Sequence, residues 1–281
     1  MKLDCAGKPL DLDLPQVVGI LNVTPDSFSD GARFMDPEAA VVRGRQLVAE
    51  GAAVVDVGAE STRPGAVPVP ARVELDRLIP VVEALSAELP VPISVDTSKA
   101  DVMEAAVAAG AGLINDVYAL RLPGALEVVR DLGVPVCLMH MQGTPATMQD
   151  RPRYREVVAE VLEFLTQRLT ACQRAGIAQE RLLVDPGFGF GKTDAHNLLL
   201  LKHLEVFRGL GCPILVGLSR KGVLGRVLGR ALDARLAGGV AAAALAVWQG
   251  ASLVRTHDVA ATLDAVRWAH AVRSAGTASA G

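Results

Sequence analysis

The sequence predicts a single α/β domain folded as a (β/α)8 TIM barrel, with its functional site at the C-terminal ends of the strands. Short β-rich apolar runs alternate with longer helical patterns along almost the whole chain, which is typical of repeated βα units. The length of 281 residues suits one barrel of about 250 residues. The residues are 51% hydrophobic but only 4% aromatic, which favours a core of Ala, Val and Leu in buried parallel strands.

Eight strands are expected, and eight is the number that closes a barrel. The predicted strands span residues 17–21, 53–57, 92–95, 111–114, 134–138, 181–184, 213–216 and 252–254. Helices are predicted over residues 37–50, 73–88, 100–109, 124–132, 154–175, 197–208, 232–249 and 259–271. Glycines follow several of these helices closely, as helix C-terminal glycines do: Gly51, Gly110, Gly133, Gly176 and Gly250.

No linker rich in Pro, Ser or charge divides the chain, so we expect one barrel domain over residues 1–273. Residues 274–281 are small and polar, and we expect them to form a disordered tail. A doubly wound open sheet is the alternative architecture. Its glycine fingerprint is absent from the first βα turn, which reads NVTPDSFSDG.

The charge and the cysteines exclude several function classes. A net charge of -3 and a pI near 6.0 give no overall attraction to nucleic acid or anionic lipid, although placed residues can still hold a phosphate. The four cysteines have the spacing of neither a disulfide framework nor a zinc site. The N-terminus lacks the apolar stretch of a signal peptide, and no run is apolar and long enough to span a bilayer. We therefore expect a cytoplasmic protein without membrane or nucleic-acid partners.

Nearly every predicted strand ends in polar side chains. In a parallel barrel these ends converge on one face, so residues far apart in sequence would meet in one bowl. One acid after one strand is often a helix cap, but the repetition of the pattern weakens that interpretation. The residues are Asn22, Asp56 with Glu60, Asp96, Asn115, Met139 with His140, Asp185, Ser219 with Lys221, and Arg255 with His257.

The charges predict a bowl with two ends. Basic residues at the late strand ends, joined by Arg63 from the second loop, suit a polyanion. The acids and amides opposite them suit a heterocycle with N–H groups, because an unpaired buried donor costs roughly 1 to 3 kcal/mol. A structural role is the stronger interpretation for His140, and His257 could equally be a buried, hydrogen-bonded histidine. The basic residues are Arg220, Lys221, Arg255 and His257, and the acids and amides are Asp96, Asn115 and Asp185.

The segment DPGFGFGKT, residues 185–193, resembles a phosphate-binding loop only superficially. The Walker A pattern needs a glycine where Pro186 stands, and the glycines do not fit GxGxxG. Alternating Gly and Phe instead indicates a tight turn that lets the backbone and Phe190 approach a flat ligand, with Phe188 a candidate for the core.

The motifs taken together resemble those of the dihydropteroate synthase family, from about residue 17 to residue 266. GILNVTPDSFSDG, ESTRPGA, SVDTSK, INDV, MHMQGTP, DPGFGFGK, GLSRKG and R-x-HD all occur in the family's order. The departures are modest: Ala59 stands where Gly is common in the second loop, and Thr256 lies within R-x-HD. Neither replaces a side chain that we assign to chemistry.

The resemblance implies an enzyme that joins 6-hydroxymethyl-7,8-dihydropterin diphosphate to p-aminobenzoate and releases pyrophosphate with the help of Mg²⁺. Sulfonamide sensitivity and a homodimer formed through late helices are also family traits. By the resemblance, the pterin is bound by Asp96, Asn115, Met139, Asp185, Phe190, Gly217 and Lys221. The diphosphate faces Asn22, Arg63, Arg255 and His257, and Asn22 contacts the metal. The p-aminobenzoate site is lined by Phe28, Thr62, Pro64, Phe190, Ser219 and Lys221.

The implied chemistry is a dissociative displacement at the pterin methylene. Diphosphate leaves readily once its charge is neutralised, and the dihydropterin ring can delocalise the remaining positive charge. We assign the catalytic roles to Asp96, Lys221, Arg255 and Arg63. No general base is assigned, because an arylamine is already a neutral nucleophile and needs mainly to be positioned. Residues 24–31 are expected to act as a mobile lid that carries Phe28 over the second substrate.

Two other functions are weighed against this one. Methyltransferases that move a methyl group from methyltetrahydrofolate to a corrinoid protein resemble the same barrel, but they hold no diphosphate, and the TPDSFSDG, STRPG and SRK motifs argue against them. A non-catalytic paralogue would be expected to lack some of the catalytic residues. Asn22, Arg63, Asp96, Asp185, Lys221 and Arg255 are all present.

Overall fold

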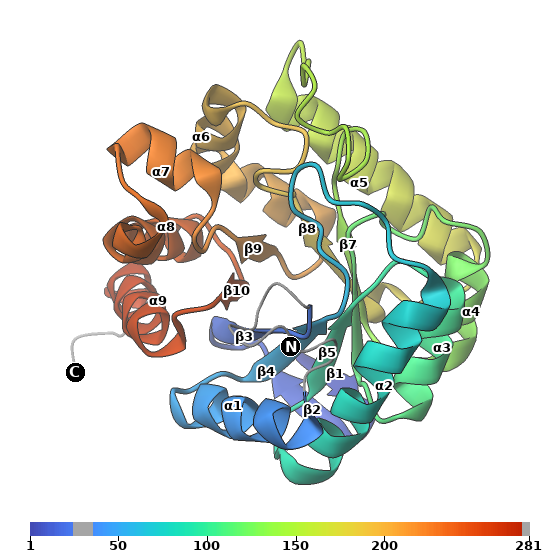
Figure 1. Ribbon diagram of the computed structural model, residues 1–281. Helices are drawn as coiled ribbons and strands as arrows, with labels where there is room; N and C mark the ends of the chain where they lie inside the picture. The colour runs from blue at the N-terminus through green and yellow to red at the C-terminus, as the bar shows by residue number, and fades with distance from the viewer. Residues whose placement is uncertain (25–35, 277–281) are drawn as a thin grey trace.

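The computed structural model describes residues 1–24 and 36–276, and the described chain forms a parallel barrel surrounded by helices (Figure 1). Its eight-stranded sheet has the order β8-β7-β6-β5-β4-β3-β10-β9, and all neighbouring strands in that order are parallel. A parallel bridge between Val184 and Ile214 joins the two ends of this order. The predicted barrel is confirmed. The strands are β3 (Gln16–Asn22), β4 (Val54–Gly58), β5 (Ile93–Asp96), β6 (Leu113–Asp116), β7 (Val136–Met139), β8 (Leu182–Asp185), β9 (Leu215–Gly217) and β10 (Leu253–Thr256).

The helices follow the predicted order with three differences. The predicted helix 197–208 is divided at His203, whose φ of -115° leaves the helical region. The predicted helix 232–249 is divided at Arg235, where a 3-10 turn precedes the α-helix. Helix α7 was not predicted, because its two glycines obscure the apolar pattern. The α-helices are α1 (Pro37–Ala49), α2 (Ala71–Glu88), α3 (Ala100–Ala108), α4 (Ala125–Leu132), α5 (Val157–Arg174), α6 (Asp194–Lys202), α7 (Gly222–Leu228), α8 (Leu236–Trp248) and α9 (Val259–Ser274). The 3-10 helices are η2 (Gln179–Arg181), η3 (Leu204–Leu210) and η4 (Leu232–Ala234).

A hairpin at the N-terminus, which the sequence pattern did not predict, closes the end of the barrel at which the strands begin. Strands β1 (Lys2–Cys5) and β2 (Lys8–Asp11) pair in antiparallel fashion through a two-residue turn with positive φ at Ala6 and Gly7. Buried side chains of this hairpin pack on apolar residues that point into the barrel. This cluster contains Leu3, Cys5, Leu10, Val18, Val54, Leu113, Cys137, Leu183, Leu215 and Leu253.

The alternation of side chains along the strands places polar residues above this apolar floor. Residues two apart on a strand face the same side, so Asp56 follows Val54 into the barrel, and Asp185 follows Leu183. Arg255 follows Leu253 in the same way. The other face of each strand packs on the helices in one large apolar cluster that includes Phe188. The barrel interior is therefore apolar near the N-terminal ends of the strands and polar at their C-terminal ends.

In the part of the chain that the structure describes, no helix is long and apolar enough to cross a membrane. Helix α9 continues to Ser274, the first residue of the expected tail, and residues 277–281 lie outside the described residues. The division into a barrel over 1–273 and a disordered tail stays a prediction.

Candidate active site

An arginine from β10 joins two acids from neighbouring strands inside the barrel. Arg255 donates from Nε to Asp56 Oδ2 at 2.5 Å and from Nη2 to Asp96 Oδ2 at 3.1 Å. The side chains of Asp56 and Asp96 are 1% and 10% exposed. Asn115 lies against the same group, with Nδ2 3.5 Å from Asp56 Oδ2. These contacts bring two predicted pterin residues and one predicted diphosphate residue into a single network.

Burial sets the charge state of Asp96. It raises the pKa of this carboxyl to about 7, helped by the neighbouring acids, whereas the charge of Arg255 acts in the opposite direction. Asp96 is therefore poised to change charge near neutral pH. Asp56 completes the network, and its place at a strand end was all that could be predicted for it from the sequence.

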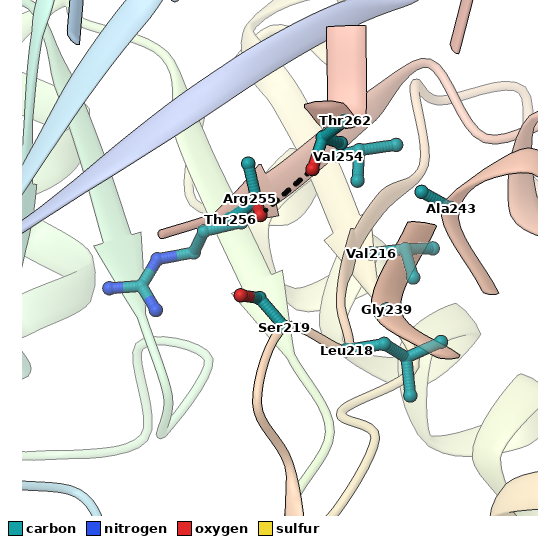
Figure 2. A pocket seen from close by; sticks show the side chains of 9 residues that line it. All are labelled: Val216, Leu218, Ser219, Gly239, Ala243, Val254, Arg255, Thr256 and Thr262. Carbon is teal, nitrogen blue, oxygen red and sulfur yellow. Dashed lines mark hydrogen bonds between the residues drawn. The ribbon is translucent and has the colours of Figure 1, made fainter. Parts of the chain in front are cut away.

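A small cavity lies behind Arg255, between β9, β10 and α8 (Figure 2). Its volume is about 10 Å³, and Figure 2 shows the Arg255 guanidinium extending away from Val216, Val254 and Ala243, which line it. The hydroxyls of Thr256 and Thr262 bond each other at 3.0 Å beside this cavity. Such a space is too small for a substrate.

Asp185, Phe190 and Lys221 form a second group in the bowl. Asp185 is 6% exposed and accepts a hydrogen bond from Gly187 N at 2.7 Å. Lys221, at the start of α7, donates to the Phe188 carbonyl, and its Nζ lies 4.5 Å from the centre of the Phe190 ring. Burial lowers the pKa of Lys221 to about 8, and the attraction of Asp185 opposes that shift. An acid, a cation and an aromatic face are thus placed side by side.

An apolar surface lies next to this group. Met139 at the end of β7 is buried with Val117, Met141 and Met148, and the half-buried ring of Phe190 packs against this cluster. Gly217 ends β9, where an added Cβ would lie 3.8 Å from Arg255 Cβ. Met139 and Phe190 therefore provide the apolar walls that a flat ring needs.

Ser219 and His257 form a hydrogen-bonded pair at the late strand ends. Ser219 Oγ lies 3.0 Å from His257 Nδ1 and accepts from the His257 backbone N–H at 3.1 Å. Burial and the nearby charges of Arg220, Arg255 and Arg63 lower the pKa of His257 to about 4, so this imidazole is neutral at pH 7. Arg220 is held by Asp258 through Nη2 and Nε, at 2.5 and 3.2 Å.

The second loop carries three predicted residues at the rim of the bowl. Thr62 is half-buried, whereas Arg63 and Pro64 are exposed. Gly65 N donates to the Pro145 carbonyl at 3.0 Å, which ties this loop to the loop after β7. The charge of Arg63 contributes to the lowered pKa of His257.

Asn22 ends β3 beside Gly58, the last residue of β4. A Cβ at Gly58 would lie 3.8 Å from Asn22 Oδ1 and 3.9 Å from Asp96 Oδ2, so these two oxygens flank the same glycine. Within residues 1–24 and 36–276, no group of three His, Cys, Asp or Glu side chains could hold a metal ion. A lone amide oxygen nevertheless fits Mg²⁺, which prefers oxygen ligands and often shares substrate phosphates and waters with the protein. Phe28 and most of the predicted lid lie outside the described residues.

Comparisons with known proteins agree with this geometry. The family model described as pterin binding enzyme matches residues 18–257. Dihydropteroate synthase of Escherichia coli (strain K12) is 50% identical over 275 residues, which cover 98% of both chains. The chain belongs to the dihydropteroate synthase family. The resemblance found in its motifs is confirmed.

Other members of the dihydropteroate synthase family are similar in sequence and in structure. The Haemophilus influenzae enzyme is 49% identical and covers 95% of this chain and 97% of its own. A Xanthomonas albilineans structure with 4-aminobenzoic acid has a TM-score of 0.92 and 56% identity, and covers 97% of this chain and 98% of its own. A Yersinia pestis structure with a sulfonamide drug has a TM-score of 0.93 and 48% identity, covering 98% and 100%.

Proposed function

We propose that this chain condenses 6-hydroxymethyl-7,8-dihydropterin diphosphate with p-aminobenzoate to give 7,8-dihydropteroate and pyrophosphate, as a transferase of folate biosynthesis. One observation carries the proposal: buried acids and an amide lie at the ends of β5, β6 and β8, whereas His257 and Arg63 follow β10 and β4 on the other side of the strand order. Related structures support it, since the Xanthomonas albilineans enzyme has been solved with 4-aminobenzoic acid and with 7,8-dihydropteroate.

The pterin ring suits the buried polar end. Its N–H and amino groups can donate to Asp185 and Asp96, and Asn115 can both donate and accept. These side chains are between 5% and 10% exposed, so a ring that leaves them unpaired is strongly disfavoured. Met139 and Phe190 would cover the faces of the ring.

The diphosphate would occupy the end near Asn22, Arg63 and His257. A neutral His257 can donate one hydrogen bond to phosphate without adding charge. Arg255 has five N–H donors, and its bonds to Asp56 and Asp96 use only two of them among the described residues. Arg255 can therefore reach the diphosphate while it still holds both acids.

We propose Mg²⁺ as the cofactor and Asn22 as its protein ligand. When bound together with the diphosphate, Mg²⁺ would neutralise charge on the leaving group. The protein's own part would be to present the Asn22 amide oxygen and to leave the remaining positions to phosphate and water.

The reaction would proceed by dissociation. The bond between the methylene carbon and the diphosphate oxygen breaks, the electron pair leaves with the diphosphate, and the ring delocalises the positive charge. Ionised Asp96 would stabilise that charge. The amino nitrogen of p-aminobenzoate then bonds to the methylene carbon, and its proton passes to water. Lys221, Ser219, Thr62, Pro64, Phe190 and Phe28 would line the p-aminobenzoate site.

The chain is further proposed to form a homodimer through α7, α8 and α9, which lie next to one another on the outside of the barrel (Figure 1). Large apolar side chains are exposed on these helices, and exposed patches of this kind mark interaction surfaces. They include Val227, Leu228, Leu236, Leu245, Trp248, Trp268 and Val272. A cytoplasmic location is proposed because Cys5, Cys137, Cys172 and Cys212 are buried and free, as in a reducing compartment.

An assay with pterin diphosphate, Mg²⁺ and p-aminobenzoate tests the function. We expect dihydropteroate and pyrophosphate in equal amounts. Pterin diphosphate that binds without yielding dihydropteroate would favour the non-catalytic paralogue. Methyl transfer that depends on a corrinoid protein would favour the methyltransferase.

A further inference from the structure

Lys192 is a buried charged residue that the proposed reaction does not use. It follows the 187–191 loop, which continues from β8, and it is only 1% exposed. In the Walker A pattern a lysine at the end of a glycine-rich loop faces a phosphate. Here the side chain instead points into the protein, where Nζ lies 2.8 Å from Gly187 O, 3.0 Å from Phe190 O and 2.8 Å from His140 Nδ1. A longer contact of 3.4 Å reaches His140 O.

Burial lowers the pKa of Lys192, and the charge of Lys221 acts in the same direction, whereas the attraction of Asp185 opposes the shift. The three acceptors around Nζ nevertheless match the donors of an ammonium group. An ammonium has three N–H donors and no lone pair, and three acceptors lie at 2.8 to 3.0 Å from Nζ among the described residues. His140 Nδ1 must then be the acceptor, which requires a neutral imidazole. Burial and the charges of Lys192 and Arg121 lower the pKa of His140 to about 2, in agreement with a neutral imidazole. Lys192 thus links the 187–191 loop to the residue that follows β7.

The backbone of the 187–191 loop lies in close contact with residues 140–142, which follow β7, and Lys192 links these two segments. Gly187 and Gly191 have φ of +71° and +65°, and an added Cβ would meet His140 O at 1.9 Å and Gln142 O at 2.5 Å. Other side chains hold the remaining carbonyls from outside, with Gln149 Nε2 2.7 Å from Gly189 O and Tyr154 Oη 2.9 Å from Gly191 O. Of Lys192, Gln149 and Tyr154, only Lys192 contacts two carbonyls of the loop and also His140, the residue that follows β7.

This loop presents several residues of the pterin end. Gly187 N bonds Asp185, the Phe188 carbonyl accepts from Lys221, and the ring of Phe190 lies beneath the Lys221 ammonium. A shift of the loop would therefore move an acid, a cation and an aromatic face at once. None of the diphosphate residues Asn22, Arg63 and His257 belongs to it.

We infer that Lys192 is a positioning residue for the pterin end of the site. Its buried ammonium fixes the 187–191 loop on the β7 side, and so sets where Asp185, Phe190 and Lys221 meet the pterin ring. The inference rests on the proposed function only in taking pterin as the ligand.

The test compares K192M with K8M. Lys8 is a matched control because its Nζ also donates to backbone carbonyls, those of Ser86 and Leu89, both at 2.8 Å, but it lies in the hairpin at the opposite end of the barrel. Calorimetry measures the affinity of each variant for 6-hydroxymethylpterin and, separately, for pyrophosphate. We expect K192M to bind the pterin roughly 10- to 100-fold more weakly, the usual effect of losing hydrogen bonds to a charged group, with pyrophosphate binding unchanged. K8M should leave both affinities unchanged.

Wild-type pterin affinity in folded K192M would overturn the inference, and so would an equal loss of pterin and pyrophosphate binding. If K192M fails to fold, H140F decides the matter. It removes one acceptor of Lys192 and keeps an aromatic ring beside Phe164, whose ring centre lies 4.8 Å from that of His140. Folded H140F should lose pterin affinity in the same direction but to a smaller extent, and unchanged affinity would refute the role of Lys192. A wild-type protein that binds pterin but makes no dihydropteroate would refute the proposed function alone.

Discussion

Arg255 Nη2 lies 3.1 Å from Asp96 Oδ2, so the residue expected to face the diphosphate also holds the acid expected to face the pterin methylene. The same guanidinium bonds Asp56 through Nε at 2.5 Å. The two ends of the site are thus joined by one side chain from β10. A change of Arg255 should therefore also affect Asp56 and Asp96.

The first prediction concerns the stability of this network. R255M should lower the free energy of unfolding by about 3 to 5 kcal/mol, because it leaves the buried carboxylate of Asp56 without its cation. The double variant R255M/D56N should recover part of the loss, since no buried charge then remains at position 56. Urea denaturation measures both. A single variant as stable as the wild type would show that the ion pair contributes nothing.

The second prediction is a pH dependence of pterin binding. The pKa of Asp96 is raised to about 7 by burial, so the carboxyl is largely protonated below that pH and ionised above it. The ionised carboxylate only accepts hydrogen bonds, whereas the protonated form turns one oxygen into a donor that faces the N–H groups of the ring. Affinity for 6-hydroxymethylpterin should therefore rise as the pH increases through about 7. Calorimetry across this range measures the effect.

Two variants show which residue causes this pH dependence. In D96N the rise should disappear. In H257Q it should persist, because the pKa of His257 is near 4 and this residue does not change charge near neutrality. A rise that is lost in H257Q but kept in D96N would contradict the assignment.

The third prediction separates the two ends of the site. D185A should weaken binding of 6-hydroxymethylpterin by roughly 10- to 100-fold, as expected for the loss of charged hydrogen bonds, and should spare pyrophosphate. R255A should mainly impair pyrophosphate binding. Thermal unfolding of both variants provides the control. Equal loss of both ligands through unfolding would undermine both assignments.

The fourth prediction concerns the second loop. Glu60 Oε1 accepts from Val69 N at 2.7 Å, which joins the two ends of that loop, and its Oε2 lies 2.6 Å from Lys99 Nζ. Lys99 also pairs with the fully buried Glu74 of α2. K99M should raise the KM for p-aminobenzoate, because Thr62 and Pro64 lose their anchor, and should destabilise the fold by about 3 to 5 kcal/mol.

Steady-state kinetics and urea denaturation measure those two effects, and E60Q serves as the milder comparison. It should raise the same KM with a smaller loss of stability, since Glu60 is 20% exposed whereas Glu74 is buried. If KM for p-aminobenzoate is unchanged in both variants, the anchor has no role in binding.

The fifth prediction tests the proposed dimer surface. L245E places a charge on the exposed face of α8, where Leu245 is 54% exposed, and should shift the protein to monomer in sedimentation equilibrium. V42E is the matched control, because Val42 is equally exposed, at 54%, but lies on α1. Dissociation by V42E and not by L245E would locate the interface elsewhere.

The barrel and most of the site could be predicted because both follow from local pattern. Alternation along each strand decides which side chains enter the barrel, and parallel strands bring their C-terminal ends together. For this reason Asn22, Asp96, Asn115 and Asp185 could be assigned to one bowl before any contact was known.

Other features depend on contacts between distant segments. The N-terminal hairpin is recognisable only from its alternation and the Ala6–Gly7 turn, and its role as the barrel floor needs the strands that it covers. The roles of Asp56 and Lys192 come from partners far away in sequence, Arg255 and His140. A signal for Lys192 existed in the glycine-rich loop that precedes it, but no pattern states that its side chain turns inward.

A crystal structure of the chain with bound 6-hydroxymethyl-7,8-dihydropterin diphosphate would test the two-ended site most directly. We expect the ring between Met139 and Phe190, with its N–H groups on Asp185 and Asp96 and the diphosphate near Asn22 and His257. A ring outside that slot, or a diphosphate directed toward Asp185, would contradict the two-ended site.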